Sequence, residues 1–213
     1  MLETTNENTN KLGIQVVEAL RKNHFEAVFY KTGEEAIQYI LPLIPQNSTI
    51  GFGGSVTLQQ LDLISELENK NLEILNHNKP GLTPEEALEI RRRQLVCDVF
   101  LTSTNAITQD GKLVNTDGTG NRVASMIFGP KTILIIAGIN KIVPSIDAAY
   151  ERIETIAAPQ NNIRLNLPNP CTKTGKCMNC ASPKRICNVT TVLHKKPSLS
   201  NIHVIIIGEE LGY

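Results

Sequence analysis

Four cysteines in the last third of the chain have a spacing that suits metal ligands. Cys171, Cys177, Cys180 and Cys187 follow the pattern C-x₅-C-x₂-C-x₆-C, in which the close Cys177–Cys180 pair is the form that wraps a metal ion. Four thiolates suit a tetrahedral structural zinc ion or a [4Fe–4S] cluster. The spacing matches neither the bacterial ferredoxin motif nor a standard zinc ribbon, so zinc and iron–sulfur both stay open. Disulfides and metal-free thiols are the alternatives.

A glycine-rich stretch, TIGFGGSVTL, is the first candidate for binding a ligand. Glycine lets the backbone approach a ligand closely, and the helix expected after the loop offers free N–H groups at its start. The candidate contacts are Gly51, Gly53, Gly54, Ser55 and Thr57. The loop fits neither the dinucleotide-binding fingerprint nor the P-loop, so a simpler phosphate or carboxylate is the expected ligand. A strand-to-helix turn with Ser55 or Thr57 as the N-cap is the structural alternative.

A second polar loop, NTDGTGNRVA, joins another strand to another expected helix. Arg122 is suited to clamp an anion with two parallel hydrogen bonds, and Asp117 to hold a hydroxyl group or act as a base. The further candidate contacts are Gly118, Thr119, Gly120 and Asn121. The alternative is an Asx turn in which Asn121 caps the helix and Arg122 pairs on the surface. Two such loops at one sheet edge favour a pocket for a small anionic ligand.

Glu209 directly follows the last apolar strand and a glycine, which can place its carboxylate at the same edge of the sheet. It is therefore the second candidate catalytic carboxylate beside Asp117, with an ordinary exposed position as the alternative. The four histidines lack any ligand spacing and are assigned no role. Cys97 ends an expected helix and is interpreted as a buried apolar residue.

The elements that position these residues alternate between strands and helices. Strands are expected at 26–30, 48–53, 72–76, 98–103 and 131–138 and from 202 onward, and helices at 12–25, 31–44, 55–69, 82–96, 121–129 and 144–158. Several strands are uniformly apolar, which is typical of an open, mostly parallel sheet with helices on both faces. We therefore predict a layered α/β fold, as one domain over residues 1–213.

Two further segments are predicted within that domain. A hairpin at 105–116, with Asp110-Gly111 in its turn, is expected as a mixed element on the same sheet. The cysteine-rich segment 166–188 is interpreted as an insertion before the last strand.

Composition limits the classes of partner. The 213-residue chain has 21 basic and 21 acidic residues, so its formal net charge is zero. That balance argues against general binding to nucleic acids or anionic membranes, which requires a basic excess. The first residues lack the features of a signal peptide, and no apolar run approaches the length of a membrane helix. Because cysteines without an export signal indicate a reducing compartment, a cytoplasmic location is expected.

Several of these segments together resemble the lactate-utilisation, or LUD-domain, family, in particular its stand-alone LutC- and YkgG-like members. The resemblance rests on GFGGSVTL, on LTSTNAITQDGKLVNTDGTGNRVA, on DAAYERIETIAAP and on the final IIIGEELGY. It runs over nearly the whole chain, and NTDGTGNRVA is its most specific block. The cysteine-rich segment looks like a feature of one subgroup.

The resemblance implies a fold similar to the NagB/RpiA/CoA-transferase superfamily, whose glycine-rich loops bind phosphorylated or carboxylated substrates. It also implies an association with lactate oxidation through an iron–sulfur system of several subunits. A redox-associated protein of organic-acid utilisation is the first hypothesis, with a redox partner or a second copy of the chain as possible partners. The alternatives are a non-redox enzyme acting on a phosphorylated sugar, a CoA ester or a folate, and a non-catalytic binding module with structural zinc.

Overall fold

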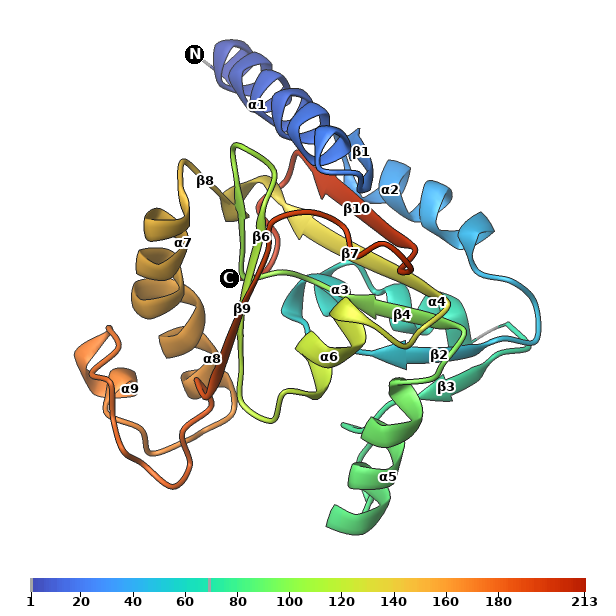
Figure 1. Cartoon of the computed structure of the whole chain (residues 1–213), viewed down its shortest axis with the longest axis vertical. Helices are drawn as coiled ribbons and strands as arrows, with labels where there is room; N and C mark the ends of the chain where they lie inside the picture. Colours follow the sequence, from blue (N-terminus) through green and yellow to red (C-terminus); the bar gives the residue numbers. More distant parts are fainter. Residues whose placement is uncertain (1, 69) are drawn as a thin grey trace.

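The computed structural model describes residues 2–68 and 70–213, and its centre is a six-stranded sheet in the order β1-β10-β7-β4-β2-β3 (Figure 1). The strands are β1 (Glu26–Tyr30), β2 (Thr49–Phe52), β3 (Glu73–Leu75), β4 (Val99–Thr102), β7 (Thr132–Gly138) and β10 (Ile202–Ile207). Every neighbouring pair in this sheet is parallel. The predicted α/β class with a mostly parallel sheet is therefore confirmed.

Helices cover both faces of the central sheet. On one face lie α1 (Leu2–Lys22), α5 (Pro84–Gln94) and α6 (Asn121–Ile127), and on the other α2 (Gly33–Ile40), α3 (Val56–Gln60) and α4 (Leu63–Glu68). Successive side chains of a strand point to opposite faces, so Ile133 and Ile135 join the first core while Leu134 and Ile136 join the second. Because β7 is buried on both faces, its residues after Thr132 are all apolar or glycine.

The hairpin predicted on the central sheet belongs to a second sheet instead. β5 (Ala106–Thr108) and β6 (Leu113–Asp117) pair antiparallel, and β8 (Ile142–Val143) and β9 (Val189–Leu193) extend them to the order β8-β5-β6-β9. Neither β8 nor β9 is predicted from sequence, because one has two residues and the other lies in a largely polar stretch. The cysteine-rich segment precedes β9, so two strands follow it.

A long helical run covers the second sheet and extends further than predicted. α7 (Ile146–Arg152) continues through a π-helical turn (Ile153–Ala157) into α8 (Ala158–Arg164). An end at residue 158 is predicted because Pro159 follows, but that proline lies in the first turn of α8, where its missing N–H is tolerated. The extension adds another turn of helix beside the second sheet.

Helix starts are capped as the sequence indicates. Thr83 and Glu86 form a capping box on α5, and Thr32 caps α2 with its hydroxyl group. The single helix predicted over 55–69 divides into α3 and α4, since Asp62 leaves helical geometry with a φ of 50°. Two 3₁₀ turns and one short helix complete the elements: Leu41–Leu43, Ile139–Lys141 and α9 (Cys171–Thr174). Among the described helices, none has the length and apolar composition that crossing a membrane requires.

Asp98 fastens the start of β4 to the start of β2. Its Oδ2 accepts hydrogen bonds from the backbone N–H and the hydroxyl of Thr49, both at 2.8 Å, and Lys131 Nζ lies 2.7 Å from its Oδ1. Lys131 and then Thr49 lower the pKa of Asp98 to about 2. The charged form of this carboxylate therefore stabilises the pairing of two strands whose far ends reach the candidate site.

We predict that Asp98→Asn lowers the free energy of unfolding at pH 7 by about 1 kcal/mol, because the amide is uncharged and Lys131 is solvent-exposed. Since the pKa of Asp98 is lower in the folded state, the difference in unfolding free energy between the native protein and the variant is fully present above the unfolded pKa of about 4. It is lost as the pH falls through about 2. Urea denaturation of both proteins at several pH values measures this, and a difference that does not shrink toward acid pH contradicts it.

Candidate functional site

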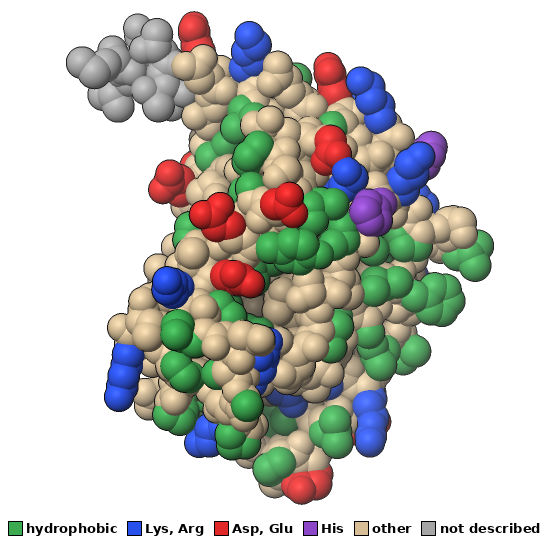
Figure 2. All heavy atoms as spheres, turned by 60° about the vertical axis from the view of Figure 1, so that its left-hand side comes forward, with side chains coloured by type: hydrophobic (Ala, Val, Ile, Leu, Met, Phe, Trp, Pro, Cys, Tyr) green, Lys and Arg blue, Asp and Glu red, His purple; other side chains and the backbone are tan. Residues whose placement is uncertain are grey.

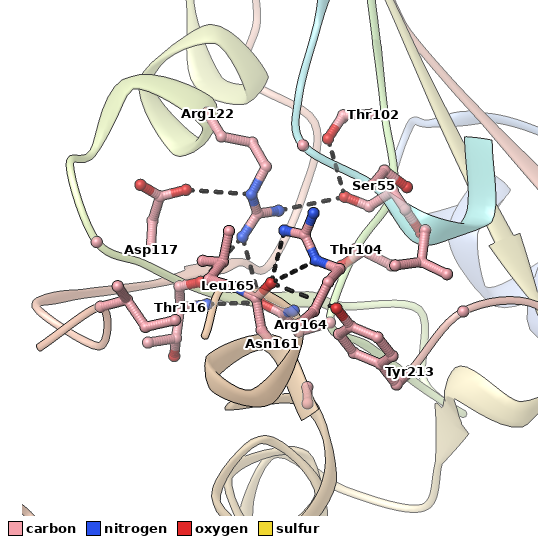
Figure 3. A pocket seen from close by; sticks show the side chains of 18 of the residues that line it. Ser55, Thr102, Thr104, Thr116, Asp117, Arg122, Asn161, Arg164, Leu165 and Tyr213 are labelled. Atoms are coloured by element: carbon pink, nitrogen blue, oxygen red, sulfur yellow. Dashed lines mark hydrogen bonds and ion pairs between the residues drawn. The ribbon is translucent and has the colours of Figure 1, made fainter. Parts of the chain in front are cut away.

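A cavity of about 230 Å³ lies at the carboxyl-terminal edge of the central sheet. Residues that follow its strands line the wall: Gly54 and Ser55 after β2, His77 and Asn78 after β3, Ser103 and Thr104 after β4, Lys141 after β7, and Gly212 and Tyr213 after β10. β6 and α8 contribute Thr116, Asp117, Asn161 and Arg164 to the wall (Figure 3). Open α/β sheets bind ligands at this edge, so the cavity is the candidate site.

The first glycine loop reaches the cavity with only part of its predicted residues. Gly54 and Ser55 line it, whereas Gly51, Gly53 and Thr57 lie behind its wall. Ser55 also caps α3, because its hydroxyl accepts a hydrogen bond from the Leu58 N–H at 3.3 Å. The loop is thus a capped strand-to-helix turn that also forms a wall of the cavity.

Gly53 makes room for the side chain of Arg122. A Cβ atom on Gly53 would lie 2.6 Å from Thr102 Oγ1 and 3.1 Å from two carbons of Arg122. Both distances are shorter than ordinary van der Waals contact. A Cβ atom on the neighbouring Gly54 would meet nothing closer than 3.8 Å. The two adjacent glycines therefore have different roles, the first in packing and the second at the cavity surface.

In the second loop, the carboxylate of Asp117 accepts hydrogen bonds from the backbone that follows it. Its Oδ1 accepts hydrogen bonds from the Thr119 and Gly120 N–H groups at 3.1 and 2.7 Å. Its Oδ2 accepts from Arg122 Nε at 3.1 Å. The Asx-turn alternative is correct for Asp117, but Gly120, with a φ of 89°, and not Asn121, is the N-cap residue of α6. Both oxygens are engaged, so the base role expected of Asp117 requires these contacts to break.

Arg122 lies at the junction of the two sheets, with 13% of its side chain exposed. Besides Asp117, its guanidinium donates hydrogen bonds to backbone oxygens and amide oxygens: Ser103 O, Thr116 O, Asn115 Oδ1 and Asn105 Oδ1. Guanidinium has five N–H donors, and these contacts engage all of them. Arg122 lines the cavity as predicted, but in this arrangement it holds the wall together and has no donor left to clamp an anion.

Lys141 is the cavity residue that sequence reasoning missed. Its side chain is buried, and Nζ lies 2.8 Å from Ser103 Oγ and 2.9 Å from Thr57 Oγ1. Burial, and then the charges of Arg152 and Arg122, lower the pKa of Lys141 to about 7. The signal in the sequence is a lone lysine in an otherwise apolar run, TILIIAGINKIV. Charged residues are rarely fully buried without a partner, and this pattern marks the position as unusual.

Two arginines and a histidine were also missed. Arg91 on α5 and Arg164 on α8 line the cavity, and no carboxylate among the described residues pairs with either of them. Arg164 is held in place by Asn161 Oδ1, at 2.7 Å from Nη2. Burial and then Arg91 lower the pKa of His77, which also lines the cavity. These residues come from helices and from a loop after β3, where sequence spacing gives no signal of a shared site.

Several cationic side chains gather in the lining of the cavity. On the face that Figure 2 shows, lysine and arginine side chains (blue) are scattered singly among acidic and apolar ones. The cavity is lined by Arg91, Arg122, Lys141 and Arg164, and Asp117 is the one acidic side chain in its described lining. Since Asp117 is paired with Arg122, no other acidic side chain in the described lining is left to pair with Arg91, Lys141 or Arg164.

Glu209 does not reach the cavity. Its side chain is exposed beside α2, where Oε2 accepts a hydrogen bond from the Gly33 N–H at 3.3 Å. The sequence placed it at the correct edge of the sheet, but the chain turns after β10 and brings Gly212 and Tyr213 to the cavity instead. The structure thus does not bring the two predicted catalytic carboxylates, Asp117 and Glu209, together.

The four cysteines of the predicted metal site face one small cavity of about 20 Å³ next to α8 and α9. They carry free thiols, and no group of three or more histidine, cysteine or acidic side chains in the described residues stands at metal-ligand distance. The donor set nevertheless fits a thiophilic metal. Asn169 also lines this cavity, and its Oδ1 is buried without a hydrogen-bond partner in the described chain. An orphaned acceptor next to four thiols suits a cation or its bound water.

We predict that Gly53→Ala destabilises the fold by about 1–3 kcal/mol, because the added methyl group must displace Arg122 or Thr102. Gly54→Ala is the matched control, since its methyl group has free space, and it is expected to change stability by less than about 0.5 kcal/mol. Chemical denaturation of the three proteins measures both effects. Equal destabilisation by the two substitutions would show that Gly53 has no special packing role.

Comparisons with known proteins agree with this fold. A search of curated proteins finds no match. Among solved structures, a DUF162 family protein from Deinococcus radiodurans has a TM-score of 0.52 at 12% sequence identity, over 93% of this chain and 98% of that one. At that identity the likeness shows the fold alone. The family model of the LUD domain matches residues 14–207, and the chain therefore belongs to the LUD-domain family.

Proposed function

We propose that this LUD-domain protein binds a small anionic ligand in the cavity at the carboxyl-terminal edge of its sheet, and that it serves the utilisation of lactate or a similar organic acid. The observation that carries the proposal is the set of cavity cations without a free carboxylate among them. A carboxylate or phosphate group satisfies donors of this kind with charge-assisted hydrogen bonds.

The arrangement of the cations favours an anion that enters from solvent. Arg164 is exposed and Arg91 is half-buried, while Lys141 is buried at the cavity wall. Arg164 and Arg91 are thus accessible to an entering carboxylate, and Ser55, Thr104 and Asn78 offer further polar groups. These residues, rather than Arg122, are the contacts that we now assign to the ligand.

The size of the cavity favours a small organic acid. Pockets for drug-sized ligands usually have volumes of about 300–1,000 Å³. The cavity here, at about 230 Å³, is smaller than a whole folate or coenzyme A requires. The lactate association of the family is in keeping with this size, and the proposal therefore names a short carboxylic acid or its phosphorylated analogue.

We further propose that Cys171, Cys177, Cys180 and Cys187 hold a metal centre, either a [4Fe–4S] cluster or zinc. Their convergence on one cavity supports this proposal. A cluster would supply one-electron transfer and fit a redox subunit, whereas zinc would fasten the segment between α8 and β9. In either case the cysteine cavity adjoins the anion cavity, because Ile186 lines both of them.

The anion site is tested by calorimetry with L-lactate, pyruvate and inorganic phosphate. We predict that Arg91→Gln weakens the binding of the best of these anions about 10-fold, which is about 1.4 kcal/mol. Arg92→Gln is the matched control, because Arg92 is the next residue of α5 and is exposed outside the cavity. Equal affinity for both variants, or no binding of any of the three anions, contradicts the proposed ligand class.

The metal centre is tested by iron, sulfide and zinc analysis of protein purified without oxygen. About four iron atoms per chain indicate a [4Fe–4S] cluster, and about one zinc ion indicates a structural site. Cys177→Ser is expected to lose the metal, and Cys97→Ser, which alters the buried cysteine between α5 and β4, is expected to retain it. Protein without stoichiometric metal of either kind would overturn this proposal.

A further inference from the structure

Lys141 and Ser103 form a pair of side chains at the wall of the cavity. Lys141 Nζ lies 2.8 Å from Ser103 Oγ, and both residues line the cavity. Lys141 is the only hydrogen-bond partner that the described residues give to the Ser103 hydroxyl group. A serine hydroxyl hydrogen-bonded to a basic group in a cavity is the arrangement of an activated nucleophile.

A third residue, Thr57, sets the direction of the hydrogen bonds. The Thr57 hydroxyl donates its proton to Leu211 O at 3.2 Å, so its oxygen accepts a hydrogen bond from Lys141. When Lys141 is neutral, one N–H is thereby directed at Thr57, and the lone pair of nitrogen is available to the Ser103 hydroxyl. Ser103 then donates to Lys141, which is the direction needed for removal of its proton.

The surroundings favour the neutral amine. Arg122 from α6 and Arg152 from α7 both act on Lys141, and the described residues give it no carboxylate partner. Arg152 is fixed near by through hydrogen bonds to Asn140 O at 3.1 Å and Asn105 O at 2.7 Å. Burial and nearby positive charge lower the pKa of the Lys141 amine to about 7. A substantial fraction of Lys141 is therefore able to accept a proton near neutral pH.

We propose that Ser103 is a nucleophile and Lys141 its general base in an acyl transfer, from a small ester or thioester whose acyl part carries a carboxylate or phosphate. Only the anionic group of this substrate rests on the proposed function. Such an activity differs from anion binding and from electron transfer at the cysteines. It makes use of the buried lysine, to which neither of those two roles assigns any chemistry.

The step balances without a further reactant except water. Ser103 Oγ bonds to the acyl carbon while its proton passes to Lys141 Nζ. The bond from the acyl carbon to the leaving oxygen or sulfur then breaks, and Lys141 returns the proton to the leaving group. Water attacks the acyl-serine ester and gives a proton to Lys141, which passes it to Ser103 Oγ as the acid departs. No oxidant or reductant is required.

The first test is acylation of the full chain by p-nitrophenyl acetate, followed by intact-mass and peptide-mass spectrometry. We expect one acetyl group per chain, located on Ser103, and loss of this label in Ser103→Ala. Ser198→Ala, which alters an exposed serine outside the cavity, is expected to keep it. Absence of a label on Ser103 in folded protein would overturn the proposal.

The role of Lys141 is tested by the rate of acylation and its pH dependence. The rate is expected to rise with pH and to level off above about 7, because only the neutral amine accepts the proton. Lys141→Met is expected to slow acylation about 100-fold or more and to remove this inflection. Circular dichroism establishes that each variant folds. Ser103→Cys provides a second variant, which is expected to form a thioester, and an unchanged pH profile in Lys141→Met would overturn the role of base.

The anionic part of the substrate is tested separately with mono-p-nitrophenyl succinate. A higher kcat/KM than for the acetate ester, lost in Arg164→Gln, supports it. Labelling of Ser103 without this preference would support the role of Ser103 as nucleophile but contradict the anion site. Anion binding without labelling would support the anion site but contradict the role of Ser103. Borohydride trapping of pyruvate on Lys141, with Ser103 unlabelled, would identify the amine itself as the nucleophile and overturn the proposal.

Discussion

The site depends on the hydrogen bonds that the guanidinium of Arg122 donates. It donates to Asp117, Asn115 and Thr116 on β6, and to Ser103 and Asn105 in the connection from β4 to β5. These hydrogen bonds join the edge of the central sheet to the second sheet. Removal of one partner of a buried ion pair commonly costs about 3–5 kcal/mol, because it leaves an uncompensated charge. The geometry of the cavity wall is therefore tied to this one side chain.

The burial of charged side chains also explains the electrostatics of the cavity. The charges of Arg152 and Arg122 both act on Lys141, and of these two arginines only Arg122 is paired with Asp117. Of the three, lysine is the group whose proton is lost most easily, since guanidinium stays charged in proteins. Repulsion among these cations is thus relieved at Lys141, whose lowered pKa gives the amine a larger neutral fraction near pH 7 than an exposed lysine has.

Sequence patterns predict the parts of this fold that rest on local or periodic signals. Unbroken apolar runs such as β7 predict a sheet buried on both faces, and the Thr83 capping box predicts the start of α5. Both glycine-rich loops reach the cavity, but the second follows β6 of the second sheet and not a strand of the central sheet. The roles of Asp117 and Arg122 are not predicted by the sequence, because a loop sequence does not tell whether donors point to a ligand or to the chain itself.

What the sequence could not predict depends on contacts between distant segments. The hairpin joins a second sheet only because β9 pairs with β6, and a two-residue strand such as β8 has no periodicity to detect. Pro159 suggested the end of a helix, although a proline in a first helical turn is tolerated. Arg164 reaches the cavity on the unpredicted α8, and Lys141 follows the predicted β7 but contacts Ser103 and Thr57 from distant segments, so their role required the three-dimensional structure.

The position of β10 in the interior of the central sheet has a consequence for the way the chain acquires its structure. Glu26 in β1 pairs with His203 in β10, and β10 also pairs with β7. During synthesis, β1 therefore emerges long before the strand that it pairs with, and the sheet cannot close until β10 has left the ribosome. Non-local pairing of this kind makes folding slow and leaves strand edges exposed. The amphipathic helix α1, which packs on β1, is available to cover that strand in the interval.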